Sequence, residues 1–364
     1  MAHAKPPRAD RRTRPRVWSM TAKNKVAAAP PDPDNDPMAS PPKIILPDSV
    51  LRQLGTSEKD EPDVISTRPH LSYSQLSMYL RCSMQYFFRY VLGLKDKPKV
   101  SLSIGKGGHA ALEWNTKKKI ETGTDQPVEA VVQKASDFMD TYLRDLPASE
   151  YEKDVEPGET KDKFLAATKV FRTRDAPKIT PIAAEVAFTL DLNQFIPDDE
   201  EPIRPIVGAL DVLSTDRDLF VAPPTIAPIK VDDYKFVTRK KSQSEVDLSP
   251  QITLYNGVVK QIVGRWPSKA GLIQLHPGTT RDGPDAIPLS RSPDLMKPEA
   301  QESRLKRLVY QFRRAEAGIK AAIFIPTDNP ITCSWCGFRE RCQMSLVNDF
   351  EAATIRASTL PPTS

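Results

Sequence analysis

The residues with the clearest chemical potential are Asp233 and Lys235, two positions apart in the segment 229–237. β-Branched and aromatic residues dominate this segment and a polar run follows it, which predicts a β-strand. Side chains alternate between the faces of a strand, so Asp233 and Lys235 share one face, and Asp232 and Tyr234 share the other. A carboxylate can bind Mg²⁺, and a neighbouring ammonium can orient a water beside a phosphate. Taken alone, such a pair is more often an ion pair on an edge strand.

A second carboxylate, Asp211, lies in the apolar segment 205–213, and an alternating segment, 184–190, precedes it. We expect both segments to be strands that form a three-stranded meander with the Asp233 strand. The meander would bring Asp211 close to Asp233. Burial of an unpaired carboxylate is costly, and a divalent cation would relieve the repulsion between the two. Glu185, in the first strand, is an additional acidic candidate.

His109 could serve the same chemistry. It follows the glycine-rich stretch 103–108, which we interpret as a flexible turn feeding a helix that begins near Gly108. No Lys-Ser or Lys-Thr pair follows the glycines, so the stretch is not a Walker-type phosphate loop. His109 and Glu113 are four residues apart and share one face of this helix. By itself, a histidine near a helix start is more often solvated than a metal ligand.

Candidate substrate contacts follow the Asp233 strand. The basic patch Arg239-Lys240-Lys241 suits contacts with phosphate groups. A helix is expected to begin near Pro250, because proline is favoured in the first turn of a helix. Gln251 and Tyr255 share a face of that helix, and both can hydrogen-bond a nucleic-acid backbone. Chance also explains a pair at this spacing.

Four cysteines in 364 residues do not suggest a secreted disulfide scaffold, and metal ligation is the better explanation. Cys333, Cys336 and Cys342 form a C-x₂-C-x₅-C pattern, in which the first pair can chelate one metal or cluster. Three ligands leave one vacancy, and Cys82 is the only other cysteine. Zinc would accept the same four sulfurs, so the spacing does not separate zinc from an iron–sulfur cluster.

Several helices and one more strand must position these residues. Apolar residues recur at helical spacing in 71–94, 128–143, 161–172 and 305–322. Ser72 or Ser74 can cap the first of these helices, and Cys82 lies in its middle. The segment 265–275 is expected to be the final strand. The proline-rich polar segment 278–302 is expected to be a loop insertion.

The composition, 39% hydrophobic and 27% charged, suits a globular protein, and the net charge of +5 permits a polyanionic partner without requiring one. No run of about 18 apolar residues predicts a membrane-spanning helix. Residues 1–66 are arginine-rich and then proline-rich, which predicts a disordered arm. We therefore expect a domain over 67–346, with the 278–302 insertion, and a flexible tail over 347–364.

From about Leu71 to Cys342, the order and spacing of these motifs resemble the RecB-like branch of the PD-(D/E)XK nuclease superfamily. Within it, they resemble the iron–sulfur nucleases that include the CRISPR-adaptation exonucleases and the nuclease domain of AddB-type helicase–nucleases. The matching positions are His109, Gly208-Ala209-Leu210-Asp211, Asp233-Tyr234-Lys235, Gln251, Tyr255, Cys82, Cys333, Cys336 and Cys342.

The resemblance implies an α/β fold: a restriction-endonuclease-like core with a mixed central sheet flanked by helices. A [4Fe–4S] cluster on the four cysteines, with zinc as the alternative, would join the C-terminal tail to the first helix. His109, Asp211, Asp233 and the Tyr234 carbonyl would hold Mg²⁺ or Mn²⁺. Lys235 would position the attacking water. Gln251, Tyr255, Arg239, Lys240 and Lys241 would contact the substrate backbone.

The expected activity is metal-dependent exonucleolytic hydrolysis of DNA, on single strands or duplex ends, in recombination, repair or processing. A helicase or recombination protein is the expected partner, and no membrane is involved. We expect a cytoplasmic protein of a bacterium or phage; a mitochondrial transit peptide is the alternative interpretation of the basic N-terminus. The alternative function is a catalytically idle, cluster-bearing DNA-binding or assembly module.

Overall fold

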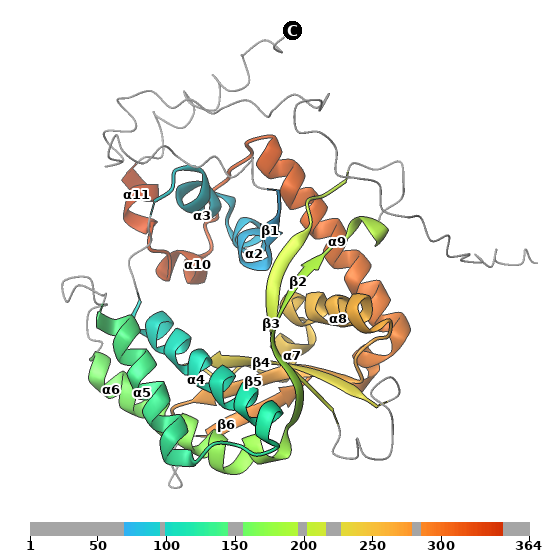
Figure 1. The fold of residues 1–364 in the computed structure, drawn as a ribbon. Helices are drawn as coiled ribbons and strands as arrows, with labels where there is room; N and C mark the ends of the chain where they lie inside the picture. Colours follow the sequence, from blue (N-terminus) through green and yellow to red (C-terminus); the bar gives the residue numbers. More distant parts are fainter. Residues whose placement is uncertain are drawn as a thin grey trace, which may run out of the picture. The chain divides into compact units, whose positions relative to one another are not determined.

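The computed structural model of the protein describes residues 69–94, 99–144, 156–195, 202–215, 227–278 and 285–344 (Figure 1). All of them belong to one compact unit, Pro41–Ser364. The arm expected at 1–66 and the tail expected at 347–364 lie outside the described residues.

The described residues contain a mixed six-stranded sheet, which confirms the predicted fold class. Its strands are β1 (Leu71–Ser72), β2 (Thr180–Leu190), β3 (Ile206–Thr215), β4 (Ile229–Phe236), β5 (Lys269–His276) and β6 (Asp285–Ser290). The predicted meander is confirmed, since β2 pairs antiparallel with β3 and β3 pairs antiparallel with β4. Beyond the meander, β4 pairs parallel with β5, and β5 antiparallel with β6.

The pairing of β3 creates a split in the sheet. Along one edge, β2 pairs with β3 from Ile206 to Thr215. On the other edge, β1 pairs only with Ile206 and Val207, and β4 pairs only from Val212 onward. Within the described part of the chain, residues 208–211 therefore have no strand partner on that edge. Asp211 lies in this split, next to the point where β4 leaves β3 and continues beside β5.

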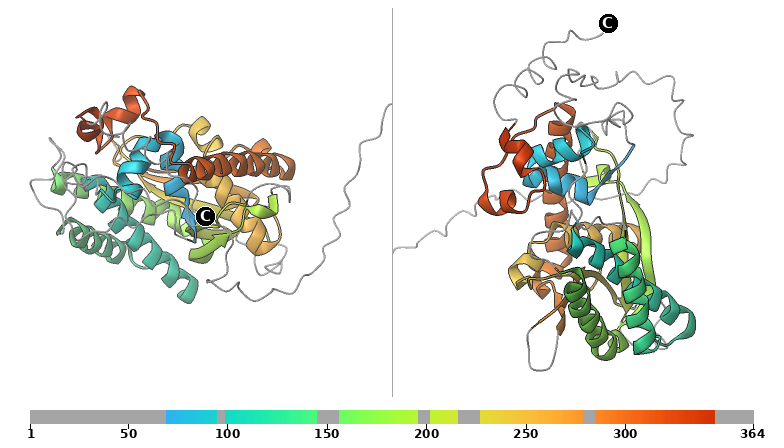
Figure 2. Two further views of the ribbon diagram at one scale, coloured as in Figure 1. Left: turned by 90° about the horizontal axis from the view of Figure 1, so that it is seen from above. Right: turned by 90° about the vertical axis from the view of Figure 1, so that its left-hand side faces the viewer.

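Helices cover both faces of the sheet. The longer ones are α4 (Val100–Thr122), α5 (Val128–Arg144), α6 (Pro157–Val170), α8 (Pro250–Val263) and α9 (Pro298–Lys320). Figures 1 and 2 show α4, α5 and α6 on one side and α8 and α9 on the other. One hydrophobic core accordingly joins strand residues such as Val231 to α8 and α9, and another joins Tyr234 and Ile273 to α4 and α6. The predicted helices at 128–143, 161–172 and 305–322 are present, and Pro250 occupies the first turn of α8.

The short helices other than α7 (Gln243–Asp247) lie together beside the main core, to which Leu76 and Tyr86 contribute. They are α2 (Tyr73–Arg81), α3 (Ser83–Tyr86) with a π-helical turn (Phe87–Val91), α10 (Pro330–Ser334) and α11 (Arg339–Met344). In both figures, the C-terminal helices α10 and α11 lie beside the N-terminal helices α2 and α3. Ser83 Oγ links the two parts: it accepts a hydrogen bond from the Ile325 N–H at 2.6 Å and donates to the Ile325 carbonyl at 3.0 Å. We call this assembly the cysteine lobe.

The single helix expected over 71–94 is wrong. Leu71 and Ser72 form β1, and Ser72 caps α2 with a complete capping box, as one of the two predicted caps. Cys82 does not lie inside a helix: its backbone is extended, with φ −161° and ψ 106°, and it separates α2 from α3. Apolar residues keep their helical spacing across the break because α2 and α3 bury the same side. The periodicity of the sequence therefore does not reveal the break.

The turn expected at the glycines 103–108 is also wrong, because α4 runs through them. A Cβ on Gly107 would lie 2.5 Å from the Met139 backbone nitrogen on α5, and a Cβ on Gly108 would meet the Phe236 ring on β4. These glycines thus allow α4 to approach α5 and the sheet closely. The packing gained in this way outweighs the free-energy cost of placing glycine inside a helix.

The loop insertion expected at 278–302 contains β6, a short 3-10 turn (Pro293–Met296) and the first turn of α9. The strand at 265–275 is therefore not the last one. Pro288 lies within β6 opposite Ile273. Proline is tolerated there because β6 is an edge strand and needs no outward hydrogen-bond donor.

Candidate functional site

Asp211 is at the centre of the split between β3 and β4. Its Oδ2 accepts a hydrogen bond from the Tyr234 backbone N–H at 2.7 Å. The same oxygen lies 3.4 Å from Nδ1 of His109, which α4 projects toward the sheet. The carboxylate thus replaces the missing ladder contact between β3 and the end of β4. Asp211 thus bridges the two strands at the split and also faces a histidine from another element.

Asp233 lies on β4 and is buried, with Lys235 on the same face, as the strand alternation predicted. The Lys235 Nζ is 2.7 Å from Asp233 Oδ2. On the other side, Oδ1 accepts hydrogen bonds from Gln251 Nε2 at 3.1 Å and from the Tyr255 hydroxyl at 3.4 Å. Helix α8 and the strand therefore hold the carboxylate from two sides.

Glu185 joins the group from β2. The register on either side of it, Ala184 with Val212 and Val186 with Leu210, places Glu185 opposite Asp211. Ligand atoms of His109, Glu185 and Asp211 all lie within 4.8 Å of one another. The Glu185 backbone has a φ of 49°, a left-handed conformation that costs a non-glycine residue about 1–2 kcal/mol. The additional acidic candidate of the sequence is thus part of the cluster.

The electrostatics of the cluster disfavour charge when no cation is present. Burial, with the nearby Asp233 charge, raises the pKa of Asp211 to about 8. Burial and the neighbouring Glu113 raise the pKa of Glu185, and burial with Lys235 lowers the pKa of His109. A divalent cation would reverse the shifts of the two carboxyl groups, because it favours carboxylates, and it would lower the pKa of His109 further, because it favours neutral imidazole.

The cluster fits a hard divalent ion. The buried Asp233 carboxylate has a cationic partner, because Lys235 Nζ lies 2.7 Å from its Oδ2. Three carboxylates and one imidazole form a donor set that suits Mg²⁺ or Mn²⁺ rather than a soft metal. His109, Asp211 and Glu185 already form a compact group without an ion, while Asp233 is engaged by Lys235, Gln251 and Tyr255.

A comparison with known families agrees with this geometry. The family model of the PD-(D/E)XK nuclease superfamily matches residues 70–343, most of the chain. The chain belongs to the PD-(D/E)XK nuclease superfamily. Its members hydrolyse phosphodiester bonds with divalent metals such as Mg²⁺ or Mn²⁺, and the present chain is accordingly a nuclease. A search of curated proteins found no match. In the described part of the chain, no helix is long and apolar enough to span a membrane.

The predicted substrate contacts of this nuclease have other partners in the structure. Gln251 and Tyr255 face Asp233, and Gln251 also donates to the Tyr255 hydroxyl at 2.9 Å. Tyr255 is buried, which suits support of the Asp233 carboxylate rather than contact with a substrate. Arg239 forms an ion pair with Glu245 at 2.6 Å.

The other two residues of the predicted basic patch differ from each other in exposure. Lys240 is exposed, whereas Lys241 is half-buried and its backbone N–H donates to Gln274 Oε1 at 2.6 Å. Of the three basic residues, only Arg239 lines the large cavity beside the site.

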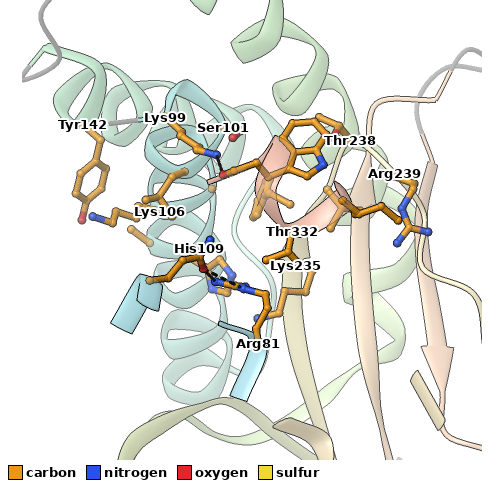
Figure 3. A pocket seen from close by; sticks show the side chains of 18 of the residues that line it. Arg81, Lys99, Ser101, Lys106, His109, Tyr142, Lys235, Thr238, Arg239 and Thr332 are labelled. Atoms are coloured by element: carbon orange, nitrogen blue, oxygen red, sulfur yellow. Dashed lines mark hydrogen bonds between the residues drawn. The ribbon is translucent and has the colours of Figure 1, made fainter. Parts of the chain in front are cut away.

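That cavity has a volume of about 1060 Å³ and contains His109 and Lys235 (Figure 3). Basic side chains from α2, from α4 and from the end of β4 also line it, as do residues of α10. Lys99, Lys106 and Arg81 belong to this lining but are absent from the sequence prediction. Scattered single lysines and arginines carry no spacing signal, so only the fold reveals that they surround one space.

The four cysteines line a second, smaller cavity of about 100 Å³ inside the cysteine lobe. Cys82 comes from the α2–α3 break, and Cys333, Cys336 and Cys342 come from the C-terminal segment, so the structure brings all four predicted ligands together. Phe88 and Phe338 pack beside them with ring centroids 5.5 Å apart. Burial and the neighbouring thiols raise the pKa of Cys342 to about 11, an effect that a bound metal would reverse.

Proposed function

We propose that this nuclease is a DNA exonuclease of the RecB-like iron–sulfur branch, acting in recombination, repair or DNA processing. The observation that carries the proposal is the gathering of His109, Glu185 and Asp211 at the split between β3 and β4, with Asp233 and Lys235 beside them. A helicase or recombination protein is the class of partner that would supply DNA ends to such an enzyme.

His109, Asp211, Asp233 and the Tyr234 backbone carbonyl would hold the divalent ion, and Glu185 is close enough to His109 and Asp211 to contribute a further oxygen. A bound Mg²⁺ or Mn²⁺ supplies Lewis-acid activation of the phosphate and of the attacking water. Gln251 and Tyr255 restrain the Asp233 carboxylate, as second partners of ligands commonly do.

Lys235 is the proposed positioning group for the attacking water. Its ammonium is held near Asp233, is partly exposed, and lines the large cavity, where a phosphodiester can enter. From there it can orient water by hydrogen bonding and offset the negative charge that develops on the phosphate. Its fixed location costs no reorganisation when the substrate arrives.

The four cysteines are free thiols around one cavity, which supports a shared ligand. We propose a [4Fe–4S] cluster on Cys82, Cys333, Cys336 and Cys342. A zinc ion bound by the same four sulfurs is the alternative, and iron and zinc analysis after anaerobic purification distinguishes the two.

The deciding experiment uses linear single-stranded DNA, blunt duplex DNA and circular single-stranded DNA, the linear substrates labelled at either end. Anaerobically purified protein is incubated with each substrate in Mg²⁺, in Mn²⁺ and in EDTA. We expect metal-dependent release of short products from linear DNA and no cutting of the circle. Cutting of the circle would make the enzyme an endonuclease. A folded, cluster-bearing protein that binds DNA but cleaves nothing with either metal would support the catalytically idle alternative.

A further inference from the structure

Three exposed apolar side chains gather in the large cavity that contains His109 and Lys235. Trp335 and Ile331 come from the cysteine lobe and are 69% and 74% exposed, and Leu102 comes from α4 and is 58% exposed. Single exposed apolar residues are ordinary on a protein surface, but a group within a cavity beside a reaction centre marks a binding surface. Trp335 has the largest flat face of the three.

Five lysine and arginine side chains share this lining. The cavity is lined by Arg81, Lys99, Lys106, Lys235 and Arg239, which come from α2, from α4 and the residue before it, and from β4 and the residues after it. Its acidic lining residue, Glu113, forms an ion pair with Lys117 at 2.5 Å. A cavity with this charge attracts a polyanion, and the aromatic residue within it adds an apolar contact that a bare phosphate cannot use.

The Trp335 backbone is anchored while its ring is exposed. Lys99 Nζ donates a hydrogen bond to the Trp335 carbonyl at 3.1 Å, and the same ammonium lies 5.8 Å from the centre of the indole ring. Cys333 and Cys336 flank the residue and line the cysteine cavity. The ring is therefore held at a defined place relative to α4, which also carries His109.

We propose that Trp335 is a stacking platform for an unpaired base and that this cavity guides single-stranded DNA to the site at His109 and Lys235. The inference rests on the proposed nuclease function and adds its substrate form. Base–aromatic stacking needs a free base face, which the neighbouring pairs cover in a duplex.

The test measures binding by the full-length protein in EDTA, so that no cleavage occurs. The probes are a labelled oligothymidine of about 20 nucleotides, longer than the ~4–16-nucleotide sites of single-strand binders, and a blunt hairpin duplex. We expect Trp335→Ala to weaken single-strand binding roughly 10- to 100-fold and duplex binding much less, because stacking is lost. Trp335→Phe should restore most of the affinity. Tyr310→Ala, which removes a 58% exposed aromatic on α9, should change neither.

A second variant avoids the cysteine lobe. Lys106 is exposed on α4, and Lys106→Ala should reduce the salt dependence of single-strand binding by about 0.7 in the logarithmic slope, the value for one lost phosphate contact. This measurement decides the route of the strand even if Trp335→Ala fails to fold.

The platform is overturned if folded Trp335→Ala binds oligothymidine as the unaltered protein does, and the route through the cavity is overturned if Lys106→Ala does so. Equal loss of duplex and single-strand binding in folded Trp335→Ala overturns the single-strand preference. If the protein cleaves DNA normally and neither variant changes binding, the stacking proposal is wrong and the nuclease proposal stands. If single-strand binding depends on Trp335 but no cleavage occurs in Mg²⁺ or Mn²⁺, the nuclease proposal is wrong and the stacking proposal stands.

Discussion

The split in the sheet and the cysteine lobe both gather ligands from distant parts of the chain, but they do so by different means. Around the split, strand pairing and two hydrophobic cores position His109, Glu185 and Asp211. In the cysteine lobe, Leu76 and Tyr86 belong to the main core, and a smaller cluster includes Cys82 itself. The comparison teaches that packing of the fold positions His109, Glu185 and Asp211, whereas the proposed cluster ligand Cys82 is itself part of the packing of its lobe.

The largest effect is expected from removing charge at the split. We predict that Asp211→Asn lowers cleavage roughly 10³-fold or more, by analogy with the loss of an essential electrostatic group. Folding should persist, because asparagine can still accept the hydrogen bond from the Tyr234 N–H. Initial rates in Mg²⁺ and thermal melting measure the two effects. Asp137→Asn, exposed on α5, is the matched control. Cleavage near the unaltered rate in Asp211→Asn would remove Asp211 from the site.

In the cysteine lobe, by contrast, we expect a substitution to lower the stability of the protein. Cys82→Ala should lose iron and lower the melting temperature by roughly 5–10 °C, at about 2–4 °C per kcal/mol for a domain of this size. The physical reason is that Cys82 joins the start of the domain to Cys333, Cys336 and Cys342, so its loss opens a very long loop. Iron analysis after anaerobic purification and calorimetry test this. A stable, fully loaded variant would show that Cys82 is no ligand, and one zinc with no iron in the unaltered protein would replace the cluster.

A smaller effect should come from the residues that restrain Asp233. We predict that Gln251→Ala lowers activity or metal affinity about 10- to 100-fold, and Tyr255→Phe less, because the Tyr255 contact is longer. A Mg²⁺ titration of the cleavage rate separates affinity from turnover. Gln261→Ala is the control on the same helix, since its side chain bonds the Thr189 carbonyl instead. If Gln251→Ala instead weakens DNA binding alone, the substrate contact expected from the sequence is correct.

The smallest effect concerns the pH dependence of stability without metal. The pKa of Asp211 is raised to about 8 in the folded state, so the folded protein retains a proton that the unfolded chain releases near pH 4. Stability is therefore lost as the pH rises from about 4 to 8. The pKa of Asp232 is also raised, to about 6, so its contribution to stability is likewise lost with rising pH, but this loss is complete near pH 6. Asp211→Asn should reduce the fall in melting temperature between pH 6 and 8 by a few degrees. An unchanged fall would contradict the burial of this charge.

Local patterns in the sequence were sufficient for much of the fold. Alternation placed Asp233 and Lys235 on one face of β4, and the meander followed from three neighbouring segments. Ser72 as a cap and Pro250 in a first turn were readable because caps act over three or four residues. The grouping of the four cysteines followed from their number and spacing. Apart from the cysteine grouping, these features depend on interactions within one element or between adjacent ones.

Packing between distant segments decided the rest. The glycines before His109 continue a helix because Met139 and Phe236 lie against them, and Pro288 lies in a strand because β6 is at the edge of the sheet.

The same holds for roles within the site. Only the tertiary structure brings Gln251 into contact with Asp233 and Glu185 close to Asp211. It also places Trp335 in the same cavity as His109. A side chain's periodicity determines which face of its element it occupies. Only the register and packing of the other elements determine what that face meets.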